Sequence, residues 1–98
     1  MKTYYVYILK CSDATYYTGI TSNLTNRVLE HQSGKHKDSY TFSRRPLSLM
    51  FYAEFTNVEL AIAAEKQFKK WSKAKKEALI NNQFEDLPNL AKKNFSKH

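Results

Sequence analysis

The sequence contains few of the residues that cross-link a chain or interrupt its regular structure. Its 98 residues include one cysteine, two glycines and two prolines. With Cys11 alone, the chain cannot form an internal disulfide and has no second thiolate for a cysteine-rich metal site. We therefore expect a domain that folds without covalent cross-links in the reducing cytoplasm.

Long apolar stretches are also missing. No run approaches the roughly 18 apolar residues that a membrane-spanning helix needs, so we expect no membrane partner. The length predicts one domain with a modest hydrophobic core. A site on such a small domain is expected to be an open cleft rather than a deep cavity.

Positive charge, by contrast, is in excess. The chain has 16 Lys and Arg against 9 Asp and Glu, a formal net charge of +7. This balance favours an anionic partner, most commonly nucleic acid, although a soluble basic surface without a specific partner is an alternative. Six lysines fall between Lys66 and Lys76, where they either contact phosphates or form a solvated helix face.

Residue patterning predicts a small mixed domain. Strands are expected at residues 3–10, 15–20 and 48–55. Helices are expected at residues 23–33, 58–71 and 73–82. This β-β-α-β-α-α order predicts an α+β domain over residues 1–82, with a three-stranded antiparallel sheet flanked by helices. Residues 83–98 are expected to form a loosely packed C-terminal tail.

The two glycines bracket the first expected helix. Ser22 or Asn23 fits its N-cap, and Gly34 fits the left-handed position that ends many helices. We expect Gly19 to be a structural turn residue that lets the chain bend tightly before the helix. The polar, basic connection at 35–47 is expected to contain a short helical turn.

Two side chains on the first expected helix suit work on a phosphate. Arg27 and His31 lie four residues apart, on one edge of the apolar stripe that Leu24 and Val28 define. A guanidinium recognises a phosphate in bidentate fashion, and an imidazole can move a proton near neutral pH. Two ordinary polar residues on the flank of a helix are the alternative.

A glutamate is expected in the middle of an apolar face on the second helix. Around Glu65, helical projection places four apolar residues: Val58, Ala61, Ile62 and Phe68. A carboxylate there must be paired, protonated or bound to a cation, and Mg²⁺ prefers such oxygens. The alternative is an ion pair with Lys69 on a helix rotated from this projection.

These residues together resemble the signature of a nuclease family. The tripeptides YVY at 5–7 and YTG at 17–19 are similar to the paired motif of the GIY-YIG nucleases. Arg27 follows Tyr17 by ten residues, His31 comes one helical turn later, and Glu65 stands on a later helix, as in that family.

The resemblance covers roughly residues 3–80 and implies metal-dependent hydrolysis of a phosphodiester in DNA. It implies that Glu65 holds one Mg²⁺ or Mn²⁺ ion and that Arg27 binds the scissile phosphate. Tyr7 or Tyr17 would orient or deprotonate the attacking water, and His31 would relay that proton or hydrogen-bond a tyrosine. We expect Tyr7 and Tyr17 on one side of the sheet, which requires an odd number of residues in the hairpin loop or a bulge.

Branched, nicked or flapped DNA is the expected substrate, and RNA stays open. The expected nucleic-acid contacts come from six basic residues: Lys66, Lys69, Lys70, Lys73, Arg44 and Arg45. A binding module with little or no turnover is the second interpretation. A catalytic subunit that needs a protein partner for targeting is the third.

Overall fold

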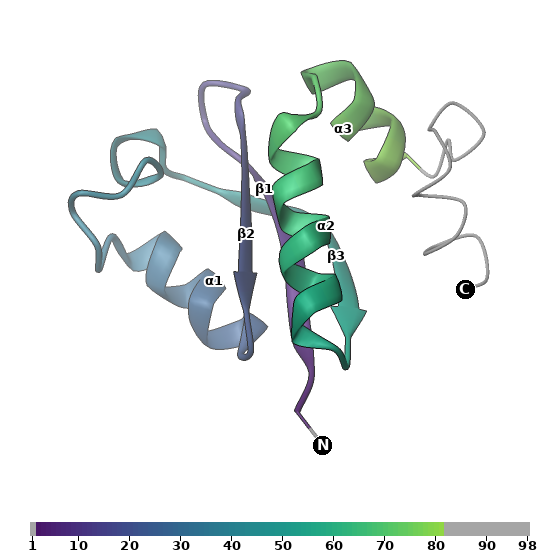
Figure 1. Cartoon of the computed structure of the whole chain (residues 1–98). Coiled ribbons are helices and arrows are strands. Elements are labelled where there is room, and N and C mark those ends of the chain that lie inside the picture. The colour runs from purple at the N-terminus through teal and green to yellow at the C-terminus, as the bar shows by residue number, and fades with distance from the viewer. Residues whose placement is uncertain (1, 82–98) are drawn as a thin grey trace.

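The computed structural model describes residues 2–81 and has the α+β architecture that the sequence predicts (Figure 1). Its elements are β1 (Tyr4–Lys10), β2 (Tyr16–Thr21), α1 (Leu24–Ser33), a 3₁₀ turn (Phe42–Arg44), β3 (Ser48–Phe55), α2 (Val58–Lys70) and α3 (Lys73–Ile80). The expected tail at 83–98 lies outside the described residues, so the domain boundary stays a prediction. None of the described helices is long and apolar enough to cross a membrane.

The three strands form an antiparallel sheet in the order β2-β1-β3. β1 takes the central place because both of its faces are apolar. Val6 and Ile8 are fully buried on one face, and Tyr7 and Leu9 are fully buried on the other.

The hairpin between β1 and β2 aligns the two motif tyrosines. Five residues, 11–15, separate the strands, and the Cys11 N–H donates to the Thr15 carbonyl oxygen at 2.8 Å. In the resulting register Tyr7 pairs with Gly19, and Tyr17 with Leu9. Because positions two apart share a face, Tyr7 and Tyr17 lie on the same side of the sheet, as predicted, and the five-residue loop meets the requirement for an odd number of residues.

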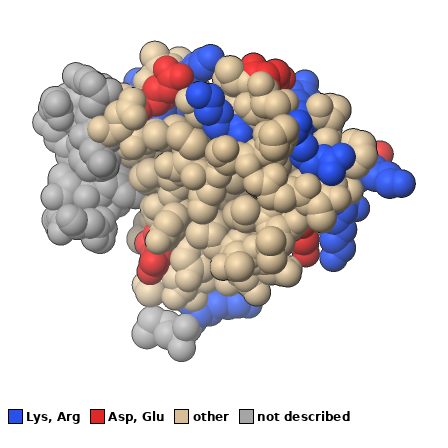
Figure 2. Space-filling model, turned by 180° about the vertical axis from the view of Figure 1, so that it is seen from behind, with Lys and Arg blue, Asp and Glu red and all other residues tan. Residues whose placement is uncertain are grey.

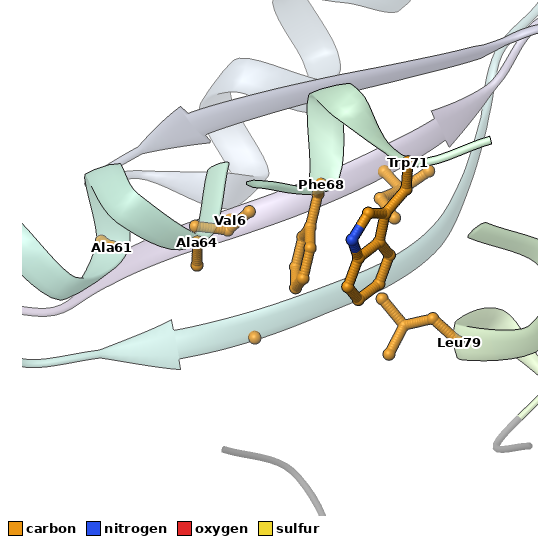
Figure 3. Packing of buried hydrophobic residues seen from close by; sticks show 8 residues of the cluster. Val6, Ala61, Ala64, Phe68, Trp71 and Leu79 are labelled. Atoms are coloured by element: carbon orange, nitrogen blue, oxygen red, sulfur yellow. The ribbon is translucent and has the colours of Figure 1, made fainter. Parts of the chain in front are cut away.

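The main core lies between the sheet and the helices α2 and α3. Its buried members are Val6, Ile8, Ala53, Ala61, Ala64, Phe68, Trp71 and Leu79. Figure 3 shows the rings of Phe68 and Trp71 side by side next to Leu79, and the ring centroids are 4.8 Å apart. Aromatic pairs of this kind add about 0.5–1.5 kcal/mol to the stabilisation from burial alone.

The orientation of α2 corrects one prediction. Val58 and Ile62 are each 40% exposed, so they do not form the buried face that was expected around Glu65. The buried stripe instead follows Ala61, Ala64 and Phe68. Two alanines let the helix approach the sheet closely along this line, and the large Phe68 ring fills the space beyond them. Glu65 consequently lies beside the buried stripe rather than at its centre.

The run of six lysines is not a uniform solvated face. Lys76 is only 9% exposed, and burial lowers the pKa of its ammonium group. The Lys75 ammonium lies 5.7 Å from the centroid of the Trp71 ring. These two lysines lie on α3, whose buried side packs toward the core, so their alkyl chains cover apolar surface. The exposed members are Lys66, Lys69, Lys70 and Lys73.

The helix α1 begins and ends as the sequence predicts. The Asn23 side chain accepts a hydrogen bond from the Asn26 N–H at 3.1 Å, which caps the first turn. Gly34 ends the helix in the left-handed conformation, with φ of 74°. Leu24 and Val28 pack on a second buried cluster that includes Tyr7, and this contact holds α1 beside the sheet.

Candidate active site

Tyr7 is the centre of the second cluster and is completely buried. Its hydroxyl lies 3.0 Å from Nε2 of His31, so a hydrogen bond joins β1 to α1. The Tyr7 ring reaches this position by passing over Gly19 on β2. A methyl group on Gly19 would overlap the Tyr7 hydroxyl and lie 2.5 Å from its Cζ.

The role of Gly19 therefore differs from the one predicted. Gly19 lies inside β2 and does not form a turn. Its missing side chain is needed because the Tyr7 ring occupies the space that a Cβ would take. A strand glycine and a turn glycine look alike in the sequence, and only the strand register distinguishes them.

An aromatic cluster surrounds this hydrogen bond. The Tyr7 and Tyr17 ring centroids are 6.4 Å apart, and the His31 ring lies 5.9 Å from Tyr7 and 5.2 Å from Tyr17. Tyr40 stacks on Tyr17, with centroids 6.2 Å apart and planes inclined by 23°. Three of the residues singled out in the sequence are thus brought into contact, together with one that was not.

His31 has a second partner on the connection between α1 and β3. Its Nδ1 lies 2.9 Å from Oγ1 of Thr41, which in turn lies 2.8 Å from Oγ of Ser39. Thr41 is 1% exposed, although it lies in a connection that is rich in polar and basic residues. Sequence reasoning missed both hydroxyls, because nothing in a polar, basic segment marks Thr41 as a residue whose side chain is buried.

Burial sets the protonation states of the central pair. Burial, reinforced by the Tyr17 hydroxyl and the Glu65 charge, raises the pKa of Tyr7 to about 12, although the Arg27 cation opposes this change. Burial also lowers the pKa of His31, and the Arg27 and His36 charges act in the same direction. At neutral pH the Tyr7 phenol is therefore protonated and the His31 imidazole is neutral.

Arg27 lies at the rim of the cluster. Its side chain is 41% exposed, and its Nε lies 3.4 Å from Oε1 of Glu30. Glu30 also pairs with Lys35 and His36, at 3.5 and 3.3 Å. No pattern in the sequence marks Glu30 as part of the site. Its carboxylate holds Arg27 beside the Tyr7 phenol while leaving part of the guanidinium open to solvent.

Glu65 approaches the same cluster from α2. Its side chain is 13% exposed, and one carboxylate oxygen lies 2.8 Å from Nζ of Lys69. The ion pair that was the alternative interpretation is therefore present. The ion pair also interacts electrostatically with the tyrosines. The Glu65 charge contributes to the raised pKa of Tyr7. The pKa of Lys69 is raised chiefly by Glu65 and, to a smaller extent, by Tyr17.

The donor set near Glu65 limits what cation could bind. Within residues 2–81, no group of three or more His, Cys, Asp or Glu residues is arranged to hold a metal. A single carboxylate suits Mg²⁺, which keeps several waters and takes one or two protein oxygens. It does not suit a cation that requires a full set of protein ligands, such as structural Zn²⁺.

The two arginines predicted to contact nucleic acid are engaged within the chain. The Arg44 Nε donates to Asp13 at 3.1 Å, and its guanidinium lies 3.8 Å over the Tyr40 ring. The Arg45 Nε donates to the Phe42 carbonyl oxygen at 2.8 Å. These bonds anchor the connection around Tyr40, and contact with nucleic acid stays a prediction for both residues.

Exposed positive charge is unevenly distributed. Seen from behind, the middle of the molecule is uncharged and the Lys and Arg side chains lie around its rim (Figure 2). The four exposed lysines of α2 and α3 lie on elements that pack on the front of the sheet (Figure 1). The back of the molecule therefore offers little charge to a phosphate backbone at its centre.

Comparison with known proteins identifies relatives over most of the chain. The family described as the GIY-YIG catalytic domain matches residues 3–78. A UPF0213 protein of Syntrophus aciditrophicus is 46% identical over 80 residues, covering 82% of this chain and 92% of that protein. Another, of Pediococcus pentosaceus, is 39% identical over 87 residues, covering 89% and 90%.

Two solved structures are also similar. The solution structure of a UPF0213 protein from Bacillus halodurans has a TM-score of 0.53 at 39% identity and covers 81% of this chain and 83% of its own. The solution structure of a protein from E. faecalis has a TM-score of 0.59 at 32% identity, with coverage of 84% and 86%. Both agree with the fold described above.

Proposed function

The chain belongs to the GIY-YIG nuclease family, and from that premise we propose that it is a metal-dependent endonuclease acting on DNA. The observation that carries the proposal is the 3.0 Å hydrogen bond between Tyr7 and His31, inside a cluster that Tyr17 completes. Arg27 and Glu65 contribute opposite charges to the surroundings of the same phenol.

Burial divides the roles of the two tyrosines. Tyr7 is completely buried and its pKa is raised, so it suits a fixed hydrogen-bonding role. Tyr17 is half-buried, and we assign it contact with the attacking water. The partly exposed Arg27 would bind the scissile phosphate through its guanidinium, and His31 would hold Tyr7 in place.

Glu65 is the residue that would hold the metal ion. A bound Mg²⁺ or Mn²⁺ supplies Lewis-acid stabilisation to the oxygen that leaves the phosphorus. Lys69 is paired with Glu65 in the free protein, so it must share the carboxylate or turn away when a cation binds. The exposed position of Lys69, with 53% of its side chain accessible, permits that movement.

The substrate proposal rests on the exposed lysines and the partly exposed Arg27. Lysines contact phosphates without reading base sequence, which supports recognition of DNA shape such as a branch, nick or flap, with RNA as the alternative. Action on such structures would belong to DNA repair in the cytoplasm. Targeting to them by a separate protein partner is part of this proposal.

A nucleic-acid-binding module with little turnover is the second candidate. The Glu65–Lys69 ion pair favours it, because a paired carboxylate has less charge to offer a cation. Under this interpretation the aromatic cluster would be a structural feature of the fold. The two candidates differ in whether metal-dependent cleavage occurs.

The test compares cleavage by the wild type and by Glu65→Gln. Labelled linear, nicked, flap and four-way DNA would be incubated with Mg²⁺, Mn²⁺ or EDTA. We expect metal-dependent cleavage that falls about 100- to 1000-fold or more in Glu65→Gln, because a main charge-stabilising group is lost. DNA binding should change little, because the phosphate contacts come from Arg27 and the lysines.

Glu59→Gln is the matched control, since Glu59 lies exposed in the first turn of the same helix. It should retain full activity. Full activity in Glu65→Gln would remove the nuclease mechanism. Binding without cleavage of any substrate by the wild type would leave the binding module as the function.

A further inference from the structure

His31 is hydrogen-bonded at both ring nitrogens. Its Nε2 lies 3.0 Å from the Tyr7 hydroxyl, and its Nδ1 lies 2.9 Å from Oγ1 of Thr41. All three side chains are at least nine-tenths buried. A neutral imidazole carries one N–H and one unprotonated nitrogen, so these two contacts must have opposite hydrogen-bond directions.

The direction of the hydrogen bond at Nε2 follows from the protonation state of the Tyr7 hydroxyl. A tyrosine hydroxyl is protonated at neutral pH, because its ordinary pKa is about 10. The buried Tyr7 O–H therefore needs an acceptor. Among residues 2–81, Nε2 of His31 is the acceptor within bonding distance, and the neighbouring Arg27 guanidinium can only donate. Nε2 is consequently unprotonated.

The remaining hydrogen bonds then follow in one direction. The proton of neutral His31 lies on Nδ1 and is donated to Oγ1 of Thr41. The Thr41 hydroxyl is free to donate to Oγ of Ser39, at 2.8 Å. Ser39 Oγ also accepts from the Thr41 backbone N–H at 3.2 Å, and this bond fixes the loop around the threonine. Ser39 is half-buried, which leaves its own hydroxyl proton access to solvent.

We propose that Thr41 is a positioning residue that holds His31 in the Nδ1–H tautomer and so keeps Nε2 free to accept the Tyr7 hydroxyl. The 35–47 connection would thus be part of the site, although no signature residue lies in it. The tautomer is a property of the free protein. Only its consequence for catalysis rests on the proposed nuclease function.

The test reads the tautomer directly. Long-range ¹H–¹⁵N NMR spectra of the His31 ring would be recorded at a pH where the imidazole is neutral. In the wild type we expect a protonated Nδ1 and an unprotonated Nε2. In Thr41→Val, which keeps the shape and removes the hydroxyl, the tautomer population should shift toward Nε2–H.

Two further variants make the result specific. Thr41→Ser retains the hydroxyl and should give the wild-type spectrum. If Thr41 only filled space, the loss of its methyl group in Thr41→Ser would not be compensated in this way. Thr25→Val, at an exposed position on α1, is the matched control and should leave the His31 signals unchanged. A wild-type protein in the Nε2–H form would overturn the proposal even where Thr41→Val fails to fold. An unchanged tautomer in a folded Thr41→Val would also overturn it.

Kinetics separate this proposal from the proposed function. In an active nuclease, Thr41→Val should lower kcat about tenfold or more with little change in KM, and Thr41→Ser should recover most of it. Absence of cleavage by the wild type would contradict the nuclease proposal alone, because the tautomer measurement needs no substrate.

Discussion

At the scale of single residues, the pairing of Tyr7 with Gly19 determines the geometry of the site. The tyrosine crosses from β1 over β2 to reach His31, and the glycine leaves the space for that crossing. The hydrogen bond, the burial and the raised pKa of the phenol all depend on this one close approach.

Gly19→Ala is expected to destabilise the protein by about 1–3 kcal/mol, as overpacking of a filled core does. The added methyl would push the Tyr7 ring away from His31, so any cleavage should also fall. Thermal unfolding would measure the first effect, with a lowering of Tm of about 4–8 °C per kcal/mol for a domain of this size.

A double-mutant cycle identifies the cause. In a Tyr7→Leu background the same Gly19→Ala change should cost less, because the clashing ring is absent. Gly34→Ala is a useful comparison, since its cost comes from a left-handed backbone and a close approach to the Arg45 guanidinium, and not from the Tyr7 ring. Equal costs of Gly19→Ala in the wild-type and Tyr7→Leu backgrounds would contradict the steric explanation.

At the scale of elements, α2 combines two functions on one helix. Its stripe of Ala61, Ala64 and Phe68 anchors it to the sheet. Glu65 lies beside this stripe, close enough for its charge to act on Tyr7. The exposed lysines continue from this helix into the start of α3, which turns the pair of helices into a basic surface next to the candidate site.

Removal of three of these lysines tests that surface. Because Lys69 is paired with Glu65, we choose Lys66, Lys70 and Lys73 for replacement by alanine. For duplex DNA, the plot of the logarithm of the binding constant against the logarithm of salt concentration has a negative slope. The magnitude of this slope should fall by up to about 3, near one for each lost phosphate contact. Binding at low salt should weaken on all sequences alike.

The control replaces three lysines elsewhere, so that the net charge changes equally. Lys2, Lys10 and Lys37 are exposed and lie outside α2 and α3. Their replacement should leave most of the slope in place. An equal decrease in both triple variants would indicate a general charge effect rather than binding at the helix pair.

At the scale of the whole molecule, burial of His31 links the site to stability. The folded protein holds this imidazole with a pKa below its ordinary 6.5, chiefly because of burial. Between the two pKa values the unfolded chain binds more protons than the folded one. Stability from this source is therefore complete above about pH 6.5 and is lost as the pH falls through the folded pKa.

Thermal unfolding from about pH 7.5 to pH 5 should show a falling Tm in the wild type. The decrease should be smaller in His31→Gln, whatever the absolute stability of that variant. It should persist in His36→Gln, because the His36 side chain is 54% exposed. The carboxylates Asp13 and Glu30 have lowered pKa values and affect stability only at more acidic pH. A pH-independent Tm in this range would contradict the burial argument for His31.

The sequence by itself determined the elements and much of the site. The alternation of apolar residues in strands, the caps of helices and the lengths of loops depend on residues that lie close together in the sequence. These features could therefore be predicted from the sequence alone. They predicted the three strands, the start of the first helix at Ser22 or Asn23, and its end at Gly34. The spacing of the motif likewise indicated which residues to look for.

Only the tertiary structure decided how those elements meet. The rotation of α2 about its own axis places Glu65 beside the buried stripe of that helix. This rotation depends on the volumes of the residues on β1 and β3 that pack against the stripe. The close approach to Gly19 and the inward turn of Thr41 depend on contacts between segments separated by many residues. Such contacts are selected by packing density and by the need to satisfy buried polar groups across the whole domain, and no local pattern encodes them.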